Sequence, residues 1–154
     1  MNATLDQLRR DHEHVLGVLA DFERRAPHGG DPGGSFAAFS GFLAGEVARH
    51  FTLEEEALFP LLGHHLSHEM GPLAVMLSEH AQFRQLQEGL SHAVESGDRD
   101  RQQACAQALI ELLHAHIAKE DNVLFPMAEH LLGPDERAEV DRRAQALVAA
   151  SSNA

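Results

Sequence analysis

The sequence lacks tryptophan and tyrosine altogether and contains only one cysteine among its 154 residues. Leu, Ala, Val and Phe supply most of the apolar content, and this mixture favours packed helices over a β-sheet. A single cysteine, Cys105, cannot form an internal disulfide, so nothing in the chain requires an oxidising compartment. We interpret it as a small apolar residue rather than a reactive thiol. These absences favour an all-α protein, and the length suits one domain over residues 1–154.

Basic residues are also scarce, with 12 Lys and Arg against 24 Asp and Glu and a formal net charge of −12. A surface with this charge repels phosphate backbones and anionic lipids, which disfavours nucleic-acid and membrane-surface binding. The chain lacks an apolar run of membrane-spanning length, and its N-terminus lacks the apolar segment of a secretory signal. We therefore expect a soluble, cytoplasmic protein that binds neither nucleic acid nor membranes.

Apolar residues recur at helical spacing in four long segments of the sequence. Ser35 and Asp98 are suited to cap the second and fourth helices, and Pro72 suits the first turn of the third. The links between segments are short or rich in helix breakers, so neighbouring helices should pack antiparallel. The sequence thus predicts an antiparallel up-down-up-down four-helix bundle over about 3–132, followed by a short C-terminal helix over about 134–150.

Polar side chains interrupt the apolar stripe of every predicted bundle helix. The chain has 12 histidines, and four of them fall on inward faces together with two glutamates. A lone inward histidine is usually a hydrogen-bonded core residue, but six ionisable groups without partners would be strongly unfavourable in a core. The six residues are His12, His50, Glu54, His80, His116 and Glu120. Beyond the last of them, either Val123 or Leu124 should face inward.

Two stretches of the sequence, 49–60 and 115–126, carry the same pattern. His, Glu, Leu, Phe and Pro match at identical offsets, and each copy ends in Leu-Phe-Pro. An acidic residue followed by histidine also precedes each copy, the histidines being His12 and His80. The chain therefore looks like two copies of one helical hairpin. Within the first copy, Pro60 is expected to kink or loosen its helix.

The spacing within each copy points both side chains at one place. His-x3-Glu sets its two side chains about 40° apart and roughly 6 Å along one helix face, because four residues slightly exceed one turn. The single histidine of each repeat lies on the antiparallel helix and can reach the same interior space from the opposite wall. A set of imidazoles and carboxylates without thiolate favours a binuclear iron site. Mn remains possible, and a closed four-ligand Zn site would leave ligands unused.

The order of these residues resembles that of the hemerythrin or HHE cation-binding family, whose four helices carry His, His-x3-Glu, His and His-x3-Glu. The resemblance covers about 5–132 and includes the Glu-Glu and Leu-Phe-Pro of the first motif. It implies a cofactor of two non-haem iron ions with an oxo or hydroxo bridge and with carboxylate bridges from Glu54 and Glu120. The iron ligands that the resemblance implies are His12, His50, Glu54, His80, His116 and Glu120.

One position departs from the animal oxygen-carrying hemerythrins, which have a second histidine one turn after the ligand on the third helix. Arg84 occupies that position here. A coordination position is then left for water, a glutamate or an external ligand, which disfavours reversible oxygen carriage. Glu46 and Glu55 are candidates for an outer or substitute ligand. The remaining histidines are predicted to lie at the surface: His14, His28, His64, His65, His68, His92, His114 and His130.

Three functions are compatible with such a site. The leading hypothesis is a di-iron protein that binds O2, NO or peroxide for sensing, storage or scavenging. The alternatives are a di-iron enzyme with peroxidase, NO-reducing or oxygenase chemistry, and an iron sensor or store without catalysis. The resemblance also implies that members repairing iron-sulfur clusters carry an additional Cys-bearing N-terminal segment. Because this chain starts at its first predicted helix, we expect that role less. We expect a monomer or homodimer, and the sequence indicates no particular protein partner.

Overall fold

The structure, a computed structural model, describes residues 2–25 and 34–152. Within these ranges the chain is helical apart from short links and contains no strand, which confirms the predicted all-α class. Three π-helical turns, labelled η, continue the α-helices into longer rods. In chain order the rods are α1 (Ala3–Arg25), then α2 (Ser35–Phe42), η1 (Leu43–Val47), α3 (Ala48–Leu53), η2 (Glu54–Leu58) and α4 (Phe59–Leu62), then α5 (Pro72–Ser96), then α6 (Arg99–Lys119), η3 (Glu120–Leu124) and α7 (Phe125–Leu131), and finally α8 (Pro134–Ser152).

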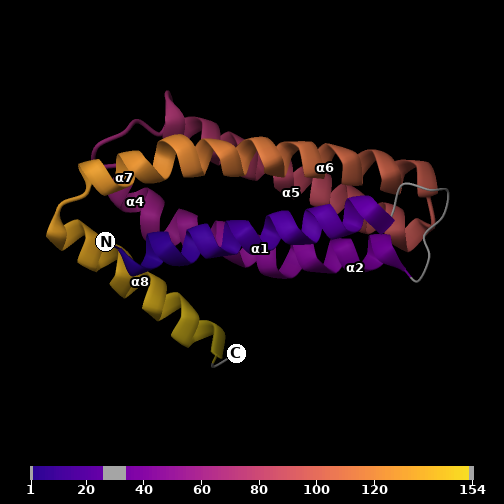
Figure 1. The fold of residues 1–154 in the computed structure, drawn as a ribbon, viewed down its shortest axis with the longest axis horizontal. Coiled ribbons are helices and arrows are strands. Elements are labelled where there is room, and N and C mark those ends of the chain that lie inside the picture. Colours follow the sequence, from indigo (N-terminus) through magenta and orange to yellow (C-terminus); the bar gives the residue numbers. More distant parts are fainter. Residues whose placement is uncertain (1, 26–33, 153–154) are drawn as a thin grey trace.

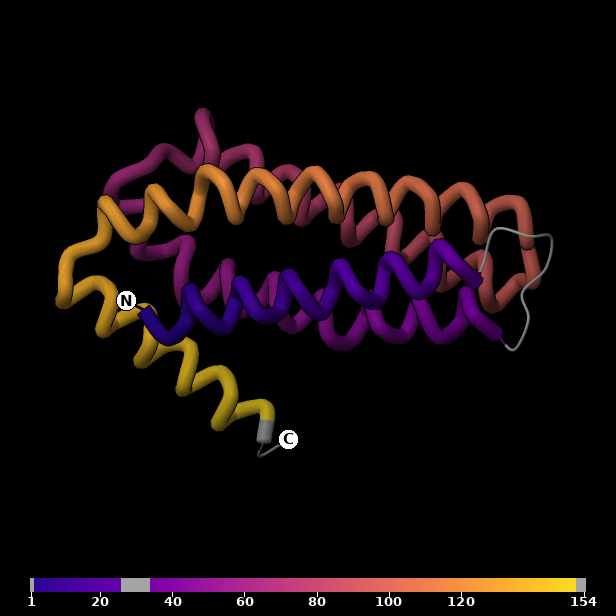
Figure 2. The backbone as a smooth tube through the Cα atoms, in the orientation of Figure 1, coloured from indigo at the N-terminus to yellow at the C-terminus, as the bar shows by residue number. Residues whose placement is uncertain are grey.

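Successive rods run in opposite directions along one long axis (Figure 1). The rod from α2 to α4 returns alongside α1, and α5 and the α6 to α7 rod then repeat this path (Figure 2). Corresponding positions in the middle of each rod are thereby brought to the same level of the bundle. The inward side chains of all four rods can meet there.

Local chemistry explains both ends of α5 and the start of α6. Pro72 begins α5, and Gly97, with φ of 70°, ends it in the left-handed conformation that glycine adopts at little cost. The Asp98 side chain caps α6 by accepting a hydrogen bond from the Arg101 amide at 3.1 Å. The prediction for Ser35 was wrong by one position, because α2 already begins there and Gly34 precedes it.

Two apolar clusters fill the bundle and leave a polar layer between them. On α1, for example, Leu8 belongs to one cluster, Val15 to the other, and the buried His12 lies between them. Cys105, half-buried, packs against the cluster that contains Val15. In the part of the chain that the structure describes, no helix combines the length and apolar character needed to cross a membrane.

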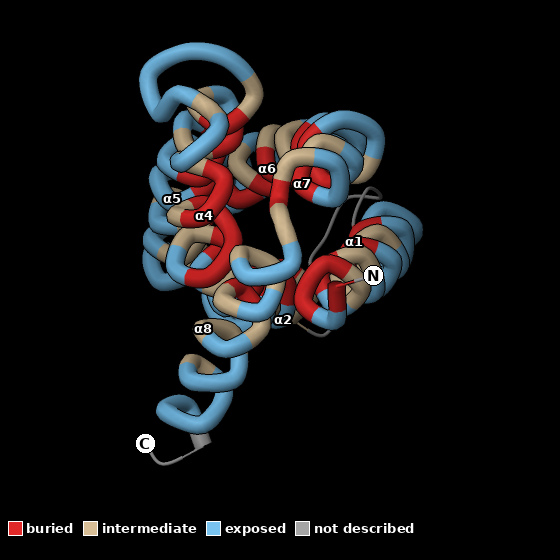
Figure 3. The backbone as a smooth tube through the Cα atoms, turned by 90° about the vertical axis from the view of Figure 1, so that its left-hand side faces the viewer, coloured by how far each residue is buried: buried red, intermediate tan, exposed pale blue. Residues whose placement is uncertain are grey.

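The C-terminal helix α8 crosses the end of the bundle at which α1 begins, and its last turns project away from the other helices (Figure 3). The Thr4 amide and hydroxyl donate to Asp141 Oδ1 at 3.1 and 2.6 Å, and Val140 is fully buried. Further along, Val148 is 62% exposed. The first half of α8 is therefore anchored to the bundle, and its second half projects away from the other helices.

Candidate metal centre

All six residues singled out by the sequence are buried in the polar layer, and every rod of the bundle contributes at least one of them. None of the six is more than 5% exposed, and three are completely enclosed. They are His12 on α1, His50 on α3, Glu54 at the start of η2, His80 on α5, His116 on α6 and Glu120 at the start of η3. The structure thus brings together every residue that the sequence placed in the site.

The six side chains form two overlapping groups, each with two imidazoles and two carboxylates. The groups are His12, His50, Glu54 and Glu120, and His80, His116, Glu54 and Glu120. In each group, one donor atom from every residue lies within 4.8 Å of the others. We call these groups the His12–His50 half and the His80–His116 half. Because both halves share the two glutamates, the arrangement can hold a pair of cations bridged by carboxylates.

The Nε2 atom of each histidine faces the shared carboxylates. His50 Nε2 lies 3.3 Å and His80 Nε2 lies 3.4 Å from Glu54 Oε1. A distance of 3.1 Å separates the Nε2 atoms of His12 and of His116 from Oε1 of the other glutamate. Ligands of one ion with metal bonds of roughly 2.1 Å lie at comparable distances from each other. The side chains therefore need little rearrangement to coordinate a cation.

Five buried side-chain atoms in this layer have no hydrogen-bond partner within the described part of the chain. They are Glu54 Oε1 and Oε2, Glu120 Oε2, His80 Nε2 and His116 Nε2. A buried polar atom without a partner costs about 1–3 kcal/mol, and native structures leave few of them. Bound cations would give partners to these atoms together, and imidazole with carboxylate is a donor set that suits iron. The residues present therefore fit a resident metal.

The other ring nitrogen of each histidine, Nδ1, is hydrogen-bonded to a carboxylate outside the ligand layer. Such a hydrogen bond fixes the ring orientation, holds the proton on Nδ1 and leaves Nε2 free to bind a metal. We call these four groups the outer carboxylates. The pairs are His12 with Asp121 (2.7 Å), His50 with Asp11 (3.0 Å), His80 with Glu55 (2.7 Å) and His116 with Glu79 (3.0 Å).

The outer carboxylates follow the internal repeat of the sequence. Asp11 and Glu79 directly precede the single histidine of each repeat and bind the histidine of the His-x3-Glu motif in the same repeat. Glu55 and Asp121 directly follow the glutamate of each motif and bind the single histidine of the other repeat. Of these four residues, only Glu55 was predicted from the sequence as an outer ligand. Acidic residues at matched offsets in both copies were the signal that could have found the other three.

The phenylalanines of the repeated Leu-Phe-Pro pack the imidazoles. The Phe59 ring stacks on His80 with centroids 5.5 Å apart, and the Phe125 ring stacks on His12 at 5.3 Å. Phe51 covers His80 more closely, at 3.9 Å. These rings restrict rotation of the imidazoles and keep water away from them. Together with the outer carboxylates, they hold the ligand layer in place before any cation binds.

Each buried glutamate begins a π-helical turn that ends just before Phe-Pro. The Phe59 amide donates to the Glu54 carbonyl, and the Phe125 amide donates to the Glu120 carbonyl, five residues earlier in each case. The proline that follows lacks an amide hydrogen, and its ring would clash with the carbonyl four residues earlier in a regular α-helix. The wider turn relieves this clash, so the loosening predicted at Pro60 takes the form of a π turn, a feature frequent at functional sites.

Protons balance the charges of the layer when no metal is bound. Burial lowers the pKa of His50, but the charge of Glu54 and the hydrogen bond to Asp11 outweigh it and raise the pKa to about 10. Burial also opposes protonation of His116, yet the negative charge of Glu120, whose Oε1 lies 3.1 Å from His116 Nε2, outweighs burial and raises the pKa of His116 to about 9. A charged imidazole carries two ring protons, and one of them must leave when a metal binds, since only neutral imidazoles coordinate.

We predict that the stability of the metal-free protein falls as the pH rises from about 6.5 to 10. A histidine whose pKa is raised on folding stabilises the protein fully below its unfolded pKa and stops doing so above its folded pKa. The pKa is raised to about 10 for His50 and to about 9 for His116, so both residues should lose their stabilising effect as the pH rises. Thermal melting of chelator-treated protein at pH 6, 8 and 10 should show a Tm falling by at least ~3 °C. Iron-loaded protein should not show this fall, and equal falls in both forms would contradict the assignment.

Two of the outer carboxylates also bind a cation. Arg84 Nη2 donates to Glu55 Oε1 at 2.7 Å, and Lys119 Nζ donates to Glu79 Oε2 at 2.5 Å. Arg84 occupies the position at which animal oxygen carriers have a second histidine on their third helix. Its guanidinium binds Glu55 outside the ligand layer. The carboxylate of Glu55 in turn binds His80 and does not enter the layer as a substitute ligand.

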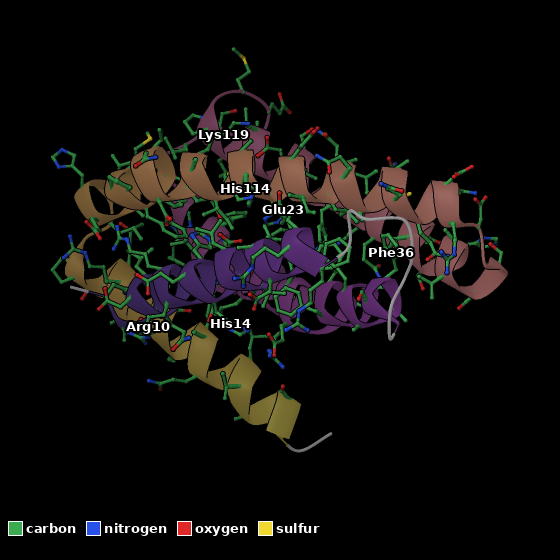
Figure 4. The ribbon with its side chains drawn as sticks, turned by 45° about the vertical axis from the view of Figure 1, so that its right-hand side comes forward. Arg10, His14, Glu23, Phe36, His114 and Lys119 are labelled. Carbon is green, nitrogen blue, oxygen red and sulfur yellow. The ribbon has the colours of Figure 1, made fainter. Side chains whose placement is uncertain are left out.

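The other candidates lie at the surface. Glu46 pairs with the exposed His14 at 3.0 Å, so its proposed part as an outer ligand was wrong. His114, on α6, lies 3.6 Å from Glu23 of α1 and is half exposed, as Figure 4 illustrates. His28 lies outside the described residues. The remaining histidines are exposed as predicted: His64, His65, His68, His92 and His130.

A cleft of about 1000 Å³ lies between α1, the second rod and α8. Its lining reaches Asp11 and His50, and the free half of α8 contributes Leu147. Figure 4 shows Arg10, which also lines the cleft, on the face of α1 toward α8, whereas Lys119 lies on the opposite side of the bundle. The cleft therefore approaches the His12–His50 half from solvent.

Comparison with known proteins agrees with this geometry. A family model described as "Hemerythrin HHE cation binding domain" matches residues 3–128. The chain is 36% identical over 93 residues to the "Iron-sulfur cluster repair protein YtfE" of Escherichia coli and of Escherichia fergusonii. The match covers 54% of this chain and 42% of each relative, so it spans less than half the length of those relatives. No solved structure matches the chain significantly.

Proposed function

The chain belongs to the hemerythrin HHE cation-binding family, and from this premise we propose that its polar layer holds two iron ions. The observation that carries the proposal is the pair of ligand groups sharing Glu54 and Glu120. In the proposed site, His12 and His50 would hold one ion, His80 and His116 would hold the other, and both ions would share the two glutamates. Iron fits imidazole and carboxylate donors, whereas a closed zinc site would use four of the six ligands.

We propose that this centre binds O2 or a related small ligand, NO or peroxide. Each ion would receive two imidazoles and one oxygen from each of two carboxylates, and non-haem iron commonly keeps positions open for such ligands. Arg84 supplies no further imidazole to the layer, and its guanidinium binds Glu55 instead of entering the layer. The cleft that reaches Asp11 and His50 gives a small molecule a path toward the layer.

The protein's own residues would prepare the site. The outer carboxylates hold the protons of the four imidazoles at Nδ1 and so present Nε2 to the ions. The Phe51, Phe59 and Phe125 rings cover the imidazoles and limit access of bulk water. Iron, when bound, would supply the reversible one-electron chemistry and the open positions. Such a site can serve sensing, storage or scavenging, and turnover by a di-iron enzyme or simple iron storage would be the alternatives.

Exposure of the anaerobic, diferrous protein to oxygen tests this proposal. We expect oxo-iron absorption bands to develop in the near ultraviolet within the time of mixing, and NO to give a distinct iron-nitrosyl spectrum. Peroxide consumption well above that of free iron would favour an enzyme instead. No spectral change with any of the three ligands would contradict small-ligand binding.

Repair of iron-sulfur clusters is a second candidate, because the relatives bear that name. The match covers only 42% of the length of those relatives, so the role of the whole relative stays a proposal for this chain. Restoration of activity to an oxidatively damaged iron-sulfur enzyme by the iron-loaded protein, and not by iron salts alone, would favour repair. We also propose a cytoplasmic, single-domain protein, and the net charge of −12 disfavours nucleic acid as a partner.

A further inference from the structure

The two halves of the polar layer carry the same ligands but differ in the charge around them. In the His80–His116 half, both outer carboxylates are paired with a cation: Glu55 with Arg84 at 2.7 Å, and Glu79 with Lys119 at 2.5 Å. Glu79 and Glu55 are also the less exposed pair of the four, at 10% and 25% of their side-chain surface. The negative charge behind these two imidazoles is therefore compensated within the protein.

The His12–His50 half lacks such compensation. Asp11 accepts a hydrogen bond from the neutral side-chain amide of Gln7 at 2.8 Å, and Asp121 contacts His12. Within residues 2–25 and 34–152, no Lys or Arg nitrogen lies within 4.0 Å of either carboxylate. Water screens them in part, since their side chains are 31% and 36% exposed, whereas Glu55 and Glu79 each also have a cationic nitrogen at hydrogen-bond distance.

This difference reaches the metal positions through the imidazoles. A carboxylate that accepts the Nδ1 proton makes the imidazole a stronger electron donor to a metal at Nε2. A cation bound to the same carboxylate withdraws part of that electron density. His80 and His116 should consequently be weaker donors than His12 and His50. Because each half has two imidazoles and shares both glutamates, the ligands themselves provide no other difference in type.

We propose that Arg84 and Lys119 make the two metal positions unequal in redox potential. This inference rests on the proposed di-iron function. When dithionite supplies one electron to the diferric protein, the ion held by His80 and His116 is reduced first. The ion held by His12 and His50 stays ferric until the second electron arrives. Arg84 and Lys119 are thus positioning residues that act through Glu55 and Glu79, and the remaining ferric ion lies in the half that the cleft approaches.

A redox titration of the iron-loaded full chain, followed by electron paramagnetic resonance and Mössbauer spectra, tests the inference. The unaltered protein should be reduced in two separate one-electron steps, with a mixed-valence state between them. K119M and R84M should each favour the ferric form in the first step by about tenfold, equivalent to about 59 mV, and leave the second step nearly unchanged. D11N should instead raise the potential of the second step, because it weakens the donor strength of His50.

R142M provides the matched control, since Arg142 pairs with Glu139 on the surface of α8 and its loss changes the net charge equally. K119R should restore the potential of the unaltered protein, which a merely structural fault would not allow. Shifts of both steps together, or shifts no larger than that of R142M, would overturn the inference. Iron content is measured first. Failure of the unaltered protein to hold two irons would overturn the proposed function, and this inference with it.

Discussion

Replacing Glu54 with Gln should reduce the iron content from two ions per chain to fewer than one. Glu54 belongs to both ligand groups, is completely buried and has two oxygens without a hydrogen-bond partner. An amide there would remove one of the two shared charges and put a nitrogen where a ligand oxygen is needed. Measurement of iron per chain after purification and after reconstitution would check this expectation.

Glu56 offers the matched control for that experiment. It lies two residues away in the same π-helical turn, and it is exposed. E56Q changes the net charge as E54Q does, but it should leave two irons bound and the melting temperature within ~1 °C of the original. Retention of two irons by E54Q would show that Glu54 does not bridge the ions.

Removal of iron should lower the melting temperature by about 10 °C at neutral pH. A ligand present at 1,000 times its dissociation constant stabilises the folded state by about 4.1 kcal/mol, and each kcal/mol corresponds to roughly 2–4 °C in a chain of this length. Without iron, the five buried atoms that have no hydrogen-bond partner among the described residues would lack a compensating cation. Differential scanning calorimetry before and after chelation measures the change.

The same treatment should have little effect on E54Q, which would already lack most of its iron. A melting temperature unaffected by chelation in the original protein would mean that the layer is stable without a cation. In that case the carboxylates and imidazoles would have to compensate one another through protons alone. The raised pKa values of His50 and His116 describe that protonated state, and they predict that its stability would depend strongly on pH.

The ligand layer could be predicted from the sequence because helix geometry dictates it. Residues three and four apart share a helix face, so His50 and Glu54 on an otherwise apolar stripe had to point into the core. The choice between Val123 and Leu124 could not be made in this way. The π turn that begins at Glu120 contains one residue more than an α-helical turn, which shifts the inward face to Leu124 and leaves Val123 46% exposed.

Contacts between helices were harder to predict than faces of helices. Which carboxylate binds which imidazole depends on the rotation and spacing of two rods, and no local pattern encodes these. Asp121, for example, binds His12 across 109 residues of sequence. The cleft depends on the angle at which α8 leaves the bundle, and the unequal pairing of the outer carboxylates depends on where Arg84 and Lys119 reach from their helices.

Anomalous X-ray diffraction at the iron edge, from crystals of iron-replete protein, tests the central claim most directly. We predict two iron peaks inside the bundle, one beside His12 and His50 and one beside His80 and His116, with the carboxylates of Glu54 and Glu120 between them. A single peak, peaks confined to the surface histidines, or no peak in a folded protein would contradict the assignment of a di-iron centre.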